Sequence, residues 1–192
     1  MLLKDWKIKD IDSAEKEAKG SEAENKKGFI REWGPYILLL GAVLLFRIFI
    51  LINATIPTES MENTIMTDTR VMGLKCSYWF SEPERGDVIV FEAPDNPEIP
   101  YVKRIIGLPG DTVEVVNGVT YVNGEILDEP YLKEPMIGSY GPYEVPEGAY
   151  FVMGDNRNSS LDARFWANTY VYKDAIWGKV YFSYWPGIGW IE

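Results

Sequence analysis

One uninterrupted apolar segment separates two parts of the chain that differ in character. Its sequence, PYILLLGAVLLFRIFILINA, covers residues 35–54, and only Arg47 and Asn53 interrupt it. At a rise of about 1.5 Å per residue, a helix of this length spans the roughly 30 Å of hydrocarbon in a bilayer. The pattern therefore predicts a transmembrane helix over 35–54 that connects residues 1–34 to residues 55–192.

Two other interpretations of this segment fit it less well. A buried core helix would spare Arg47 a cost of about 2.5 to 3.5 kcal/mol at mid-membrane. Arg47 lies close to the end of the segment, however, so its side chain can extend to the outer interface. A cleavable secretory signal is disfavoured, because the apolar region is long and the sequence at 53–55 is a poor match to a cleavage site. An uncleaved anchor is the favoured interpretation.

Basic residues before the segment predict its orientation. Lys26, Lys27 and Arg31 precede it closely, whereas only two basic residues follow within about twenty positions. The positive-inside rule then places the N-terminus in the cytoplasm and the rest of the chain outside. Residues 1–34 contain eight basic and eight acidic side chains. This mixture suits a solvated helix or, preferably, a charged cytoplasmic tail.

After the apolar segment the pattern changes to short runs that are typical of β-strands. β-branched and aromatic residues fill the runs, and Gly, Pro and Asn separate them. Asn117-Gly118 predicts a two-residue hairpin turn, because both central residues of that turn take positive φ. No helical period stands out, so residues 55–192 are predicted to form a mainly β, antiparallel domain. The runs are DVIVF (87–91), YVKRII (101–106), TVEVV (112–116), VTYV (119–122), AYFVM (149–153) and GKVYFSYW (178–185).

Composition narrows the chemistry that this domain can perform. The 192 residues are 46% hydrophobic, enough for a real core, and the net charge of −10 disfavours a nucleic-acid partner. A single cysteine, Cys76, excludes an intramolecular disulfide. With no histidine and no CxxC motif, the sequence contains no recognisable zinc site. We therefore expect no metal, no cofactor and no nucleic acid.

Ser60 lies in a predicted tight turn, IPTESMENTI, directly after the apolar segment. A serine hydroxyl needs a base, and without histidine the main substitute is a lysine. The pKa of such a lysine, ordinarily about 10.4, must fall by roughly 3, which desolvation can achieve. Lys103 fits best, because a strand places Tyr101, Lys103 and Ile105 on one apolar face. The alternative is an edge-strand lysine that prevents aggregation.

A third stretch, MGDNRNSSLDARFWA at 153–167, is dense in polar residues. By itself it fits a long polar loop whose side chains cap their own backbone. In a functional interpretation, a serine hydroxyl in it orients the lysine amine and an Asp/Arg pair braces the loop. The residues alone leave both possibilities open.

Together these stretches resemble the bacterial type I signal peptidases (leader peptidases), in their single-span, Gram-positive-like form. That family comprises membrane-anchored Ser/Lys serine proteases that remove signal peptides from exported proteins. The resemblance implies an antiparallel β catalytic domain of the signal-peptidase/LexA-like type. The stretches that carry it are PTESMENT (57–64), RGDVIVF (85–91), YVKRIIGLPGD (101–111) and GDNRNSSLDAR (154–164).

The resemblance also implies a role for each matched residue. In the family, the nucleophile and the general base form a dyad, one hydroxyl joins the nucleophile's N–H in the oxyanion hole, and three side chains support the lysine and its loop. The implied residues are Ser60 and Lys103 for the dyad, Thr58 for the oxyanion hole, and Ser160, Asp162 and Arg164 for support.

Departures from the family pattern lie close to the implied nucleophile. Thr58 and Glu59 stand where the family usually has Ser and Gly, and Asn63 replaces a usual Pro. Thr58 keeps the hydroxyl. Glu59 loses glycine's backbone freedom and brings a carboxylate next to a site of developing negative charge, which matters if its side chain points inward.

Substrates, partners and rival functions follow from the same resemblance. The implied substrates are preproteins with small residues at the first and third positions before the cut, and the implied location is the cell membrane, crossed once. A LexA-type self-cleaving repressor is a rival that would be cytosolic and bind DNA. A specialised or weakly active pilus or conjugation peptidase is a closer rival, and an inactive membrane-tethered binding module is a third. The sequence leaves the oligomeric state open.

Overall fold

The apolar segment forms a helix in the structure, a computed structural model that describes residues 28–191. The chain divides into two units, Met1–Ile48 and Phe49–Glu192. Within the described residues, the helix runs from Gly28 to Phe49 and is long and apolar enough to cross a membrane. It begins and ends earlier than the predicted span of 35–54. Residues 1–27 of the predicted tail lie outside the described part of the chain.

The last residues of the predicted span form a β-strand, because they pair with a second strand of the domain. Strand β1, Leu51–Thr55, pairs antiparallel with β2, Arg70–Leu74, along its whole length. Ile52 of β1 is buried in the domain core. This pairing and burial favour the extended conformation over continued helix, and the β-branched residues of the segment support it.

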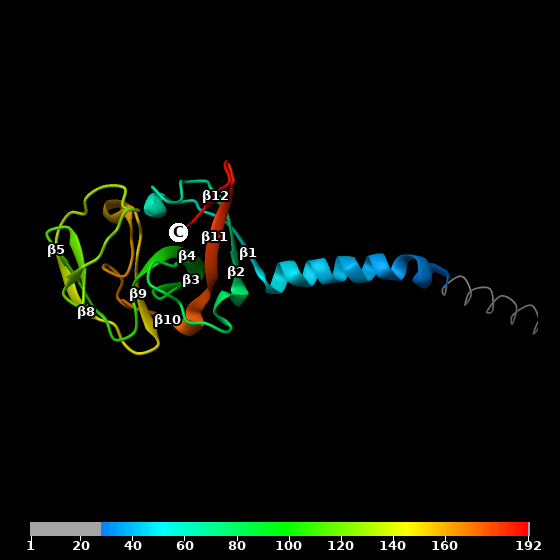
Figure 1. The fold of residues 1–192 in the computed structure, drawn as a ribbon, viewed down its shortest axis with the longest axis horizontal. Coiled ribbons are helices and arrows are strands. Elements are labelled where there is room, and N and C mark those ends of the chain that lie inside the picture. The colour runs from blue at the N-terminus through cyan, green and yellow to red at the C-terminus, as the bar shows by residue number, and fades with distance from the viewer. Residues whose placement is uncertain (1–27, 192) are drawn as a thin grey trace, which may run out of the picture. The chain divides into compact units, whose positions relative to one another are not determined.

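Two antiparallel sheets make up the second unit (Figure 1). The large sheet has the order β1-β2-β11-β3-β4-β9-β10, with β12 paired to β11, and the small sheet has the order β7-β6-β5-β8. The mainly β, antiparallel fold class is thereby confirmed. The remaining strands are β3 (Val88–Ala93), β4 (Asn96–Gly107), β5 (Thr112–Val116), β6 (Val119–Val122), β7 (Glu125–Ile126), β8 (Tyr140–Glu144), β9 (Ala149–Met153), β10 (Val171–Tyr172), β11 (Ile176–Trp185) and β12 (Gly189–Trp190).

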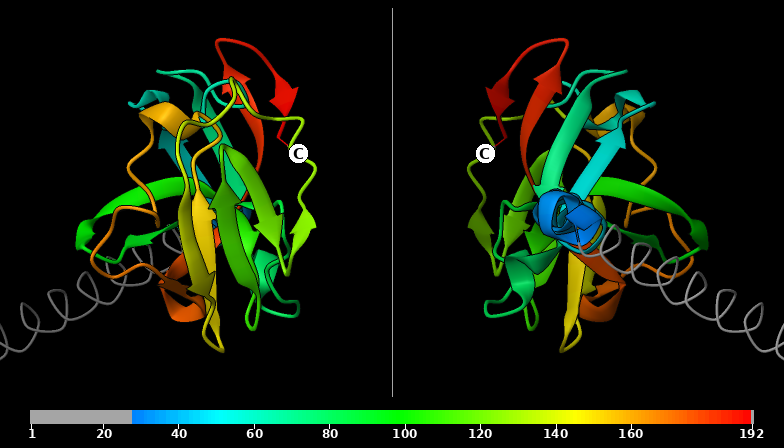
Figure 2. Two further views of the ribbon diagram at one scale, coloured as in Figure 1. Left: turned by 90° about the vertical axis from the view of Figure 1, so that its left-hand side faces the viewer. Right: turned by 90° about the vertical axis from the view of Figure 1, so that its right-hand side faces the viewer.

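Four short 3-10 helices connect strands of the described domain, and two of them belong to loops discussed below. They are η1 (Glu59–Met61), η2 (Lys75–Tyr78), η3 (Arg157–Ser159) and η4 (Lys173–Ala175). Within the domain, β5 and β8 lie on the opposite side from β1 and β2 (Figure 1). The left view of Figure 2 looks onto the small sheet, coloured green to yellow-green.

The predicted strand runs correspond to β3, β4, β5, β6, β9 and β11. The predicted hairpin joins β5 to β6, and its Asn117 and Gly118 have φ of 49° and 85°. Strand β2, the strands of two residues and the strand that contains Gly141-Pro142 were not predicted. Such segments lack the alternation of apolar and polar residues that indicates a strand, and their extended conformation depends on the strands with which they pair.

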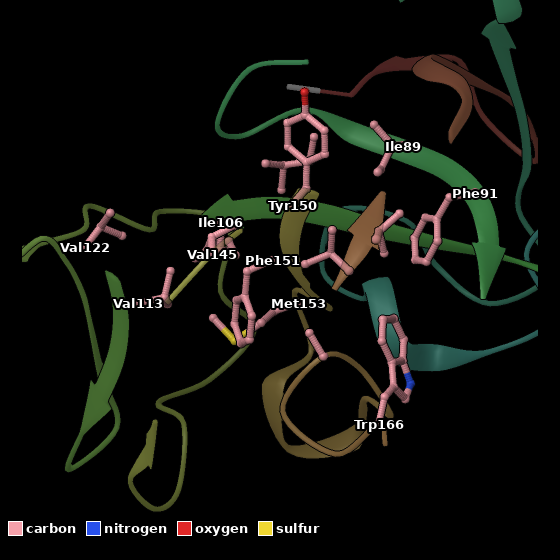
Figure 3. Packing of buried hydrophobic residues seen from close by; sticks show 14 residues of the cluster. Ile89, Phe91, Ile106, Val113, Val122, Val145, Tyr150, Phe151, Met153 and Trp166 are labelled. Carbon is pink, nitrogen blue, oxygen red and sulfur yellow. The ribbon is translucent and has the colours of Figure 1, made fainter. Parts of the chain in front are cut away.

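The main core fills the space between the two sheets. Figure 3 shows Phe151 of β9 between Val113 of the small sheet and Phe91 of the large sheet. A second cluster on the large sheet packs Ile52 and neighbouring β-branched residues against Met61. The strand β4 lies between β3 and β9, in the interior of the large sheet. Only residues 104–107 of β4 pair with β9, whereas Lys103 pairs with Ile89 of β3 alone. The burial of Lys103, and not its place in the sheet, therefore decides how this lysine is interpreted.

The close packing of β2 against β11 gives a first prediction. A methyl group added at Gly73 would lie 2.3 Å from the carbonyl oxygen of Lys179, and a paired backbone cannot move aside cheaply. We expect Gly73→Ala to lower stability by about 1 to 3 kcal/mol. At about 2 to 4 °C per kcal/mol for a chain of this size, thermal unfolding will show the loss.

Gly187→Ala is the matched control, because no heavy atom lies within 4 Å of the added methyl group. Its melting temperature should equal that of the wild type or rise slightly. Equal melting temperatures for both variants would contradict the inferred strand packing.

Candidate active site

Ser60 sits in the 3-10 turn that follows β1, and its neighbours hold this turn to the core. Met61 and Ile65 are almost fully buried, and the Ile65 N–H donates to the Met61 carbonyl. The Ser60 residue is only 7% exposed. The buried apolar side chains that follow Ser60 therefore hold the turn and its hydroxyl in position.

Lys103 reaches that hydroxyl from strand β4. Its Nζ donates a hydrogen bond of 2.6 Å to Ser60 Oγ, and the two residues are 43 positions apart in the chain. Lys103 is 4% exposed, lies opposite Ile89 in the β3–β4 ladder, and has its amine 5.6 Å from the centre of the Tyr101 ring. These facts exclude the interpretation of Lys103 as an exposed edge-strand lysine.

The surroundings lower the pKa of Lys103. Burial, which disfavours the charged amine, lowers this pKa from 10.5 to about 8. The carboxylates of Asp162 and Asp155 act in the opposite direction, and the Arg164 guanidinium adds to the lowering. A substantial share of the amine is therefore neutral at weakly alkaline pH and can accept a proton.

Two further hydroxyl groups lie close to Ser60. Thr58 Oγ1 is 3.3 Å from Ser60 Oγ. Ser160 Oγ is buried and has no hydrogen-bond partner among the described residues. A methyl group built on Gly154 would lie 2.3 Å from Ser160 Oγ and 2.4 Å from the Ser60 carbonyl oxygen, so only glycine fits between these two serines.

Asp162 and Arg164 brace the loop between β9 and β10 from inside. Arg164 donates to the Asp162 carboxylate through Nε at 2.8 Å and Nη2 at 2.9 Å. The same carboxylate accepts the Gly154 N–H at 2.9 Å. The side chains of Asp162 and Arg164 are 0% and 1% exposed, so the ion pair is shielded from solvent. The loop thus caps its own backbone, as predicted from its polar residues, and it does so next to Ser60.

Two more contacts connect this loop to the Ser60 turn, and neither was predicted from the sequence. The Asn156 N–H donates to the Ser60 carbonyl at 3.1 Å, and Asn156 Nδ2 donates to the Glu59 carbonyl at 3.1 Å. Arg104 makes a buried two-point ion pair with Asp155 at 2.9 and 2.7 Å. The sequence shows these polar residues but not which partners they take across the fold.

Ser60 and Lys103 line a groove of about 500 Å³. Most of its other residues are apolar, and they come from β1, from β3 and β4, and from the loop after β9. The lining residues are Ala54, Thr55, Ile56, Pro57, Thr58, Ser60, Val90, Ile99, Pro100, Tyr101, Val102, Lys103, Ser159 and Leu161.

Comparison with known proteins identifies the family. A family model described as "Signal peptidase, peptidase S26" matches residues 30–185, which is most of the chain. The chain belongs to this family. The predicted resemblance and the predicted enzyme class, signal peptidase I, a serine endopeptidase, are confirmed. A LexA-type repressor is not supported by this match.

Several signal peptidases are similar over most of the chain. Probable signal peptidase I-2 from Synechocystis is 41% identical over 73% of this chain and 66% of its own length. Signal peptidase I from Bacillus licheniformis is 38% identical over 74% of this chain and 82% of its own length. Signal peptidase I S from Bacillus subtilis is 38% identical over 86% of this chain and 95% of its own length.

One crystal structure of a signal peptidase I, from Enterococcus faecalis, is also similar. It is 35% identical, with a TM-score of 0.46, and the match covers 52% of this chain and 97% of that one.

The structure places Glu59 and Asn63, which depart from the signal peptidase pattern, outside the contact between Ser60 and Lys103. Glu59 is exposed, so its side chain points to solvent. Among the described non-glycine residues, positive φ occurs at Asp68, Asn117 and Asn123, so residue 59 does not need glycine's backbone freedom. Asn63 is likewise exposed. Glutamate at position 59 is therefore compatible with the turn.

Burial of a lysine without a carboxylate partner gives a second prediction. The folded-state pKa of about 8 lies below the ordinary 10.5, so the folded protein binds the proton less tightly than the unfolded chain does. The resulting decrease in the free energy of unfolding, at most about 3 kcal/mol, is fully present below pH 8 and disappears as the pH rises to 10.5. We expect Lys103→Met to raise the free energy of unfolding at pH 7 and to lose this advantage toward pH 10.

Chemical denaturation at several pH values measures this effect. Lys173→Met is the control, because the Lys173 side chain is 41% exposed and its ion pair with Glu82 is at the surface. It should change stability by less than about 1 kcal/mol at every pH. A Lys103→Met protein that is less stable than wild type at pH 7 would contradict the inferred cost.

Proposed function

We propose that this signal peptidase is a membrane-anchored endopeptidase that removes N-terminal signal peptides from exported preproteins by Ser60/Lys103 catalysis. The observation that carries the proposal is the 2.6 Å hydrogen bond between a buried amine of lowered pKa and a buried hydroxyl, both of which line a mainly apolar groove. These are the two groups that nucleophilic catalysis without histidine requires.

Acylation begins when neutral Lys103 accepts the Ser60 proton. The hydroxyl oxygen bonds to the scissile carbonyl carbon, and the carbonyl oxygen becomes an oxyanion. The carbon–nitrogen bond then breaks, and the protonated lysine gives its proton to the leaving amine. The same lysine, neutral again, takes a proton from water as water attacks the ester, and it gives this proton to the Ser60 oxygen as the bond between that oxygen and the acyl carbon breaks. The peptide acid is released and free Ser60 is regenerated.

The oxyanion is assigned to two donors, the Ser60 N–H and the Thr58 hydroxyl. The 3.3 Å separation of the Thr58 and Ser60 oxygens supports this assignment, because a donor must be close to the attacked carbon. We assign Ser160 to orienting the Lys103 amine, since its hydroxyl is buried and has no hydrogen-bond partner among the described residues. Asp162 and Arg164 hold the loop that carries Ser160.

The groove suits an extended peptide with small side chains before the cut. Strand β1 is the terminal strand of the large sheet, and its Ala54 and Thr55 line the groove. A substrate strand can pair with such an edge while its alternate side chains enter the groove. Apolar walls around Tyr101 and Val102 favour alanine-sized residues over charged ones.

The anchor brings enzyme and substrate to the same surface. The helix Gly28–Phe49 contains the 18-residue apolar window needed to span a bilayer, so we propose a single crossing with the N-terminus in the cytoplasm. The catalytic domain is then outside, and residues 1–34 contain the proposed cytoplasmic tail. A signal peptide in the same bilayer is presented to the groove by diffusion in two dimensions.

Loss of either member of the dyad tests the function. We expect Ser60→Ala and Lys103→Ala each to abolish cleavage of a model preprotein by full-length protein in detergent, with folding retained in circular dichroism. Ser81→Ala and Lys173→Ala, at two positions outside the groove, serve as controls and should cleave normally. Full cleavage by Ser60→Ala would contradict the dyad, and no cleavage by the wild type would favour a binding module.

Profiling of preprotein substrates separates a general signal peptidase from a specialised one.

The pH dependence of cleavage gives another prediction. The active base is the neutral amine, whose fraction rises as the pH rises through about 8. The value of kcat/KM should therefore increase about tenfold per pH unit below about pH 7.5 and level off above about 8.5. An activity that is flat from about pH 6 to about pH 9 would exclude Lys103 as the titrating base.

Removal of one oxyanion donor should slow turnover without unfolding the protein. Thr58→Val replaces an exposed hydroxyl with a methyl group, so we expect kcat to fall about 10²- to 10³-fold and the melting temperature to stay nearly constant. Thr58→Ser keeps a hydroxyl and should retain most activity. Unchanged kcat in Thr58→Val would remove Thr58 from this role.

A further inference from the structure

The segment between β7 and β8 covers two buried arginines that hold the loop beside Ser60. We propose that Glu129 and Tyr131 of this segment are positioning residues for the nucleophile and act through Arg157 and Arg104. The inference rests on the proposed function of Ser60. It assigns to the small sheet and its connecting segment a part in the reaction, although neither lines the groove.

Glu129 is the counter-ion of Arg157. Arg157 Nη1 donates to Glu129 Oε2 at 3.1 Å, and Nη2 donates to Oε1. The side chains of Glu129 and Arg157 are 5% and 0% exposed, so the pair is shielded from water on both sides. The Tyr131 hydroxyl also donates to Glu129 Oε1, at 2.9 Å, and fixes the carboxylate in place.

Arg157 connects Glu129 to the loop beside the nucleophile. Its Nε donates to the Gly154 carbonyl at 3.1 Å, and its Nη1 also donates to Thr120 Oγ1 of β6 at 3.0 Å. Thr120 is 1% exposed, and its strand β6 pairs with β5 and β7 on its two sides. One guanidinium therefore links the small sheet, Glu129 and the backbone at Gly154.

Tyr131 makes a parallel connection through Arg104. The guanidinium carbon of Arg104 lies 4.0 Å from the centre of the Tyr131 ring, a cation–π contact in a buried setting. Arg104 also holds Asp155 by two hydrogen bonds. Asp155 and Gly154 are consecutive, so both arginines act on the same short stretch of backbone.

That stretch is bonded to the Ser60 turn. The backbone N–H and side-chain amide of Asn156 donate to the Ser60 and Glu59 carbonyls, and Gly154 lies directly against the Ser60 carbonyl oxygen. A shift of residues 154–156 consequently shifts the peptide that carries the nucleophile. Misplacement of a reacting group by about 1 Å can cost on the order of 10² in rate.

Removal of one partner from a buried ion pair leaves the other charge unpaired, so the network is sensitive at Glu129. We expect Glu129→Gln in the full-length protein in detergent to lower kcat by about 10- to 100-fold on a peptide with alanine at the first and third positions before the cut. The value of KM should stay within twofold, because Glu129 does not line the groove. Asp128→Asn, an exposed acidic neighbour, is the matched control and should match wild type.

A double-mutant cycle separates positioning from a general loss of stability. If Glu129 acts through the Asn156 contacts, then Glu129→Gln combined with Asn156→Ala should lower kcat no further than the stronger single variant does. Multiplied effects, a higher KM at constant kcat, or wild-type kcat in Glu129→Gln would each overturn the inference.

Two further variants keep the test decisive. If Glu129→Gln does not fold, Tyr131→Phe removes only the hydroxyl donor to Glu129, and it should lower kcat at least threefold with KM unchanged. Wild-type kcat in Tyr131→Phe would then overturn the inference. Ser60→Ala in the same assay distinguishes the two proposals. Cleavage by Ser60→Ala would refute the proposed function, whereas an inactive Ser60→Ala with a fully active Glu129→Gln would refute the positioning role alone.

Discussion

The site depends on keeping one amine out of water without giving it a carboxylate partner. Two carboxylates, Asp155 and Asp162, raise the pKa of Lys103, and either one paired directly with it would hold it protonated. Each is instead bound to its own buried arginine, Arg104 or Arg164. Burial of the lysine then has the larger effect, and its pKa stays near 8.

The architecture explains how this arrangement is held. Strand β4 lies in the interior of the large sheet and carries Lys103 and Arg104 at consecutive positions. One contacts the nucleophile and the other holds Asp155 in the neighbouring loop. The same strand therefore fixes both the base and the support of the Ser60 turn. Two consecutive basic residues are costly to bury in a sheet. The ion pair with Asp155 accounts for Arg104, and the proposed catalytic role accounts for Lys103.

Much of this was predictable from the sequence, and the parts that were not share a physical cause. The strand runs and the Asn117-Gly118 turn are local patterns, so six strands and one hairpin were predicted. Ser60 and Lys103 were candidates because no histidine competes for the role of base, and the resemblance to the signal peptidases then assigned them as the dyad. Strand β1 was predicted as part of the helix, since its extended form depends on pairing with β2. Glu129 was not predicted because its partner, Arg157, lies 28 positions away and no local pattern marks the pair.

Glu59 shows why residue type alone does not settle the effect of a departure from a family pattern. The repulsion between a carboxylate and a developing oxyanion weakens as the local dielectric constant rises. Salt screens this repulsion further where solvent surrounds the carboxylate. Because the Glu59 side chain is exposed, its charge acts on the site largely through water. Its backbone carbonyl, in contrast, accepts a hydrogen bond from Asn156 and helps to anchor the turn. The contribution of this position to the site therefore comes mainly from its backbone, which glutamate supplies as well as glycine does.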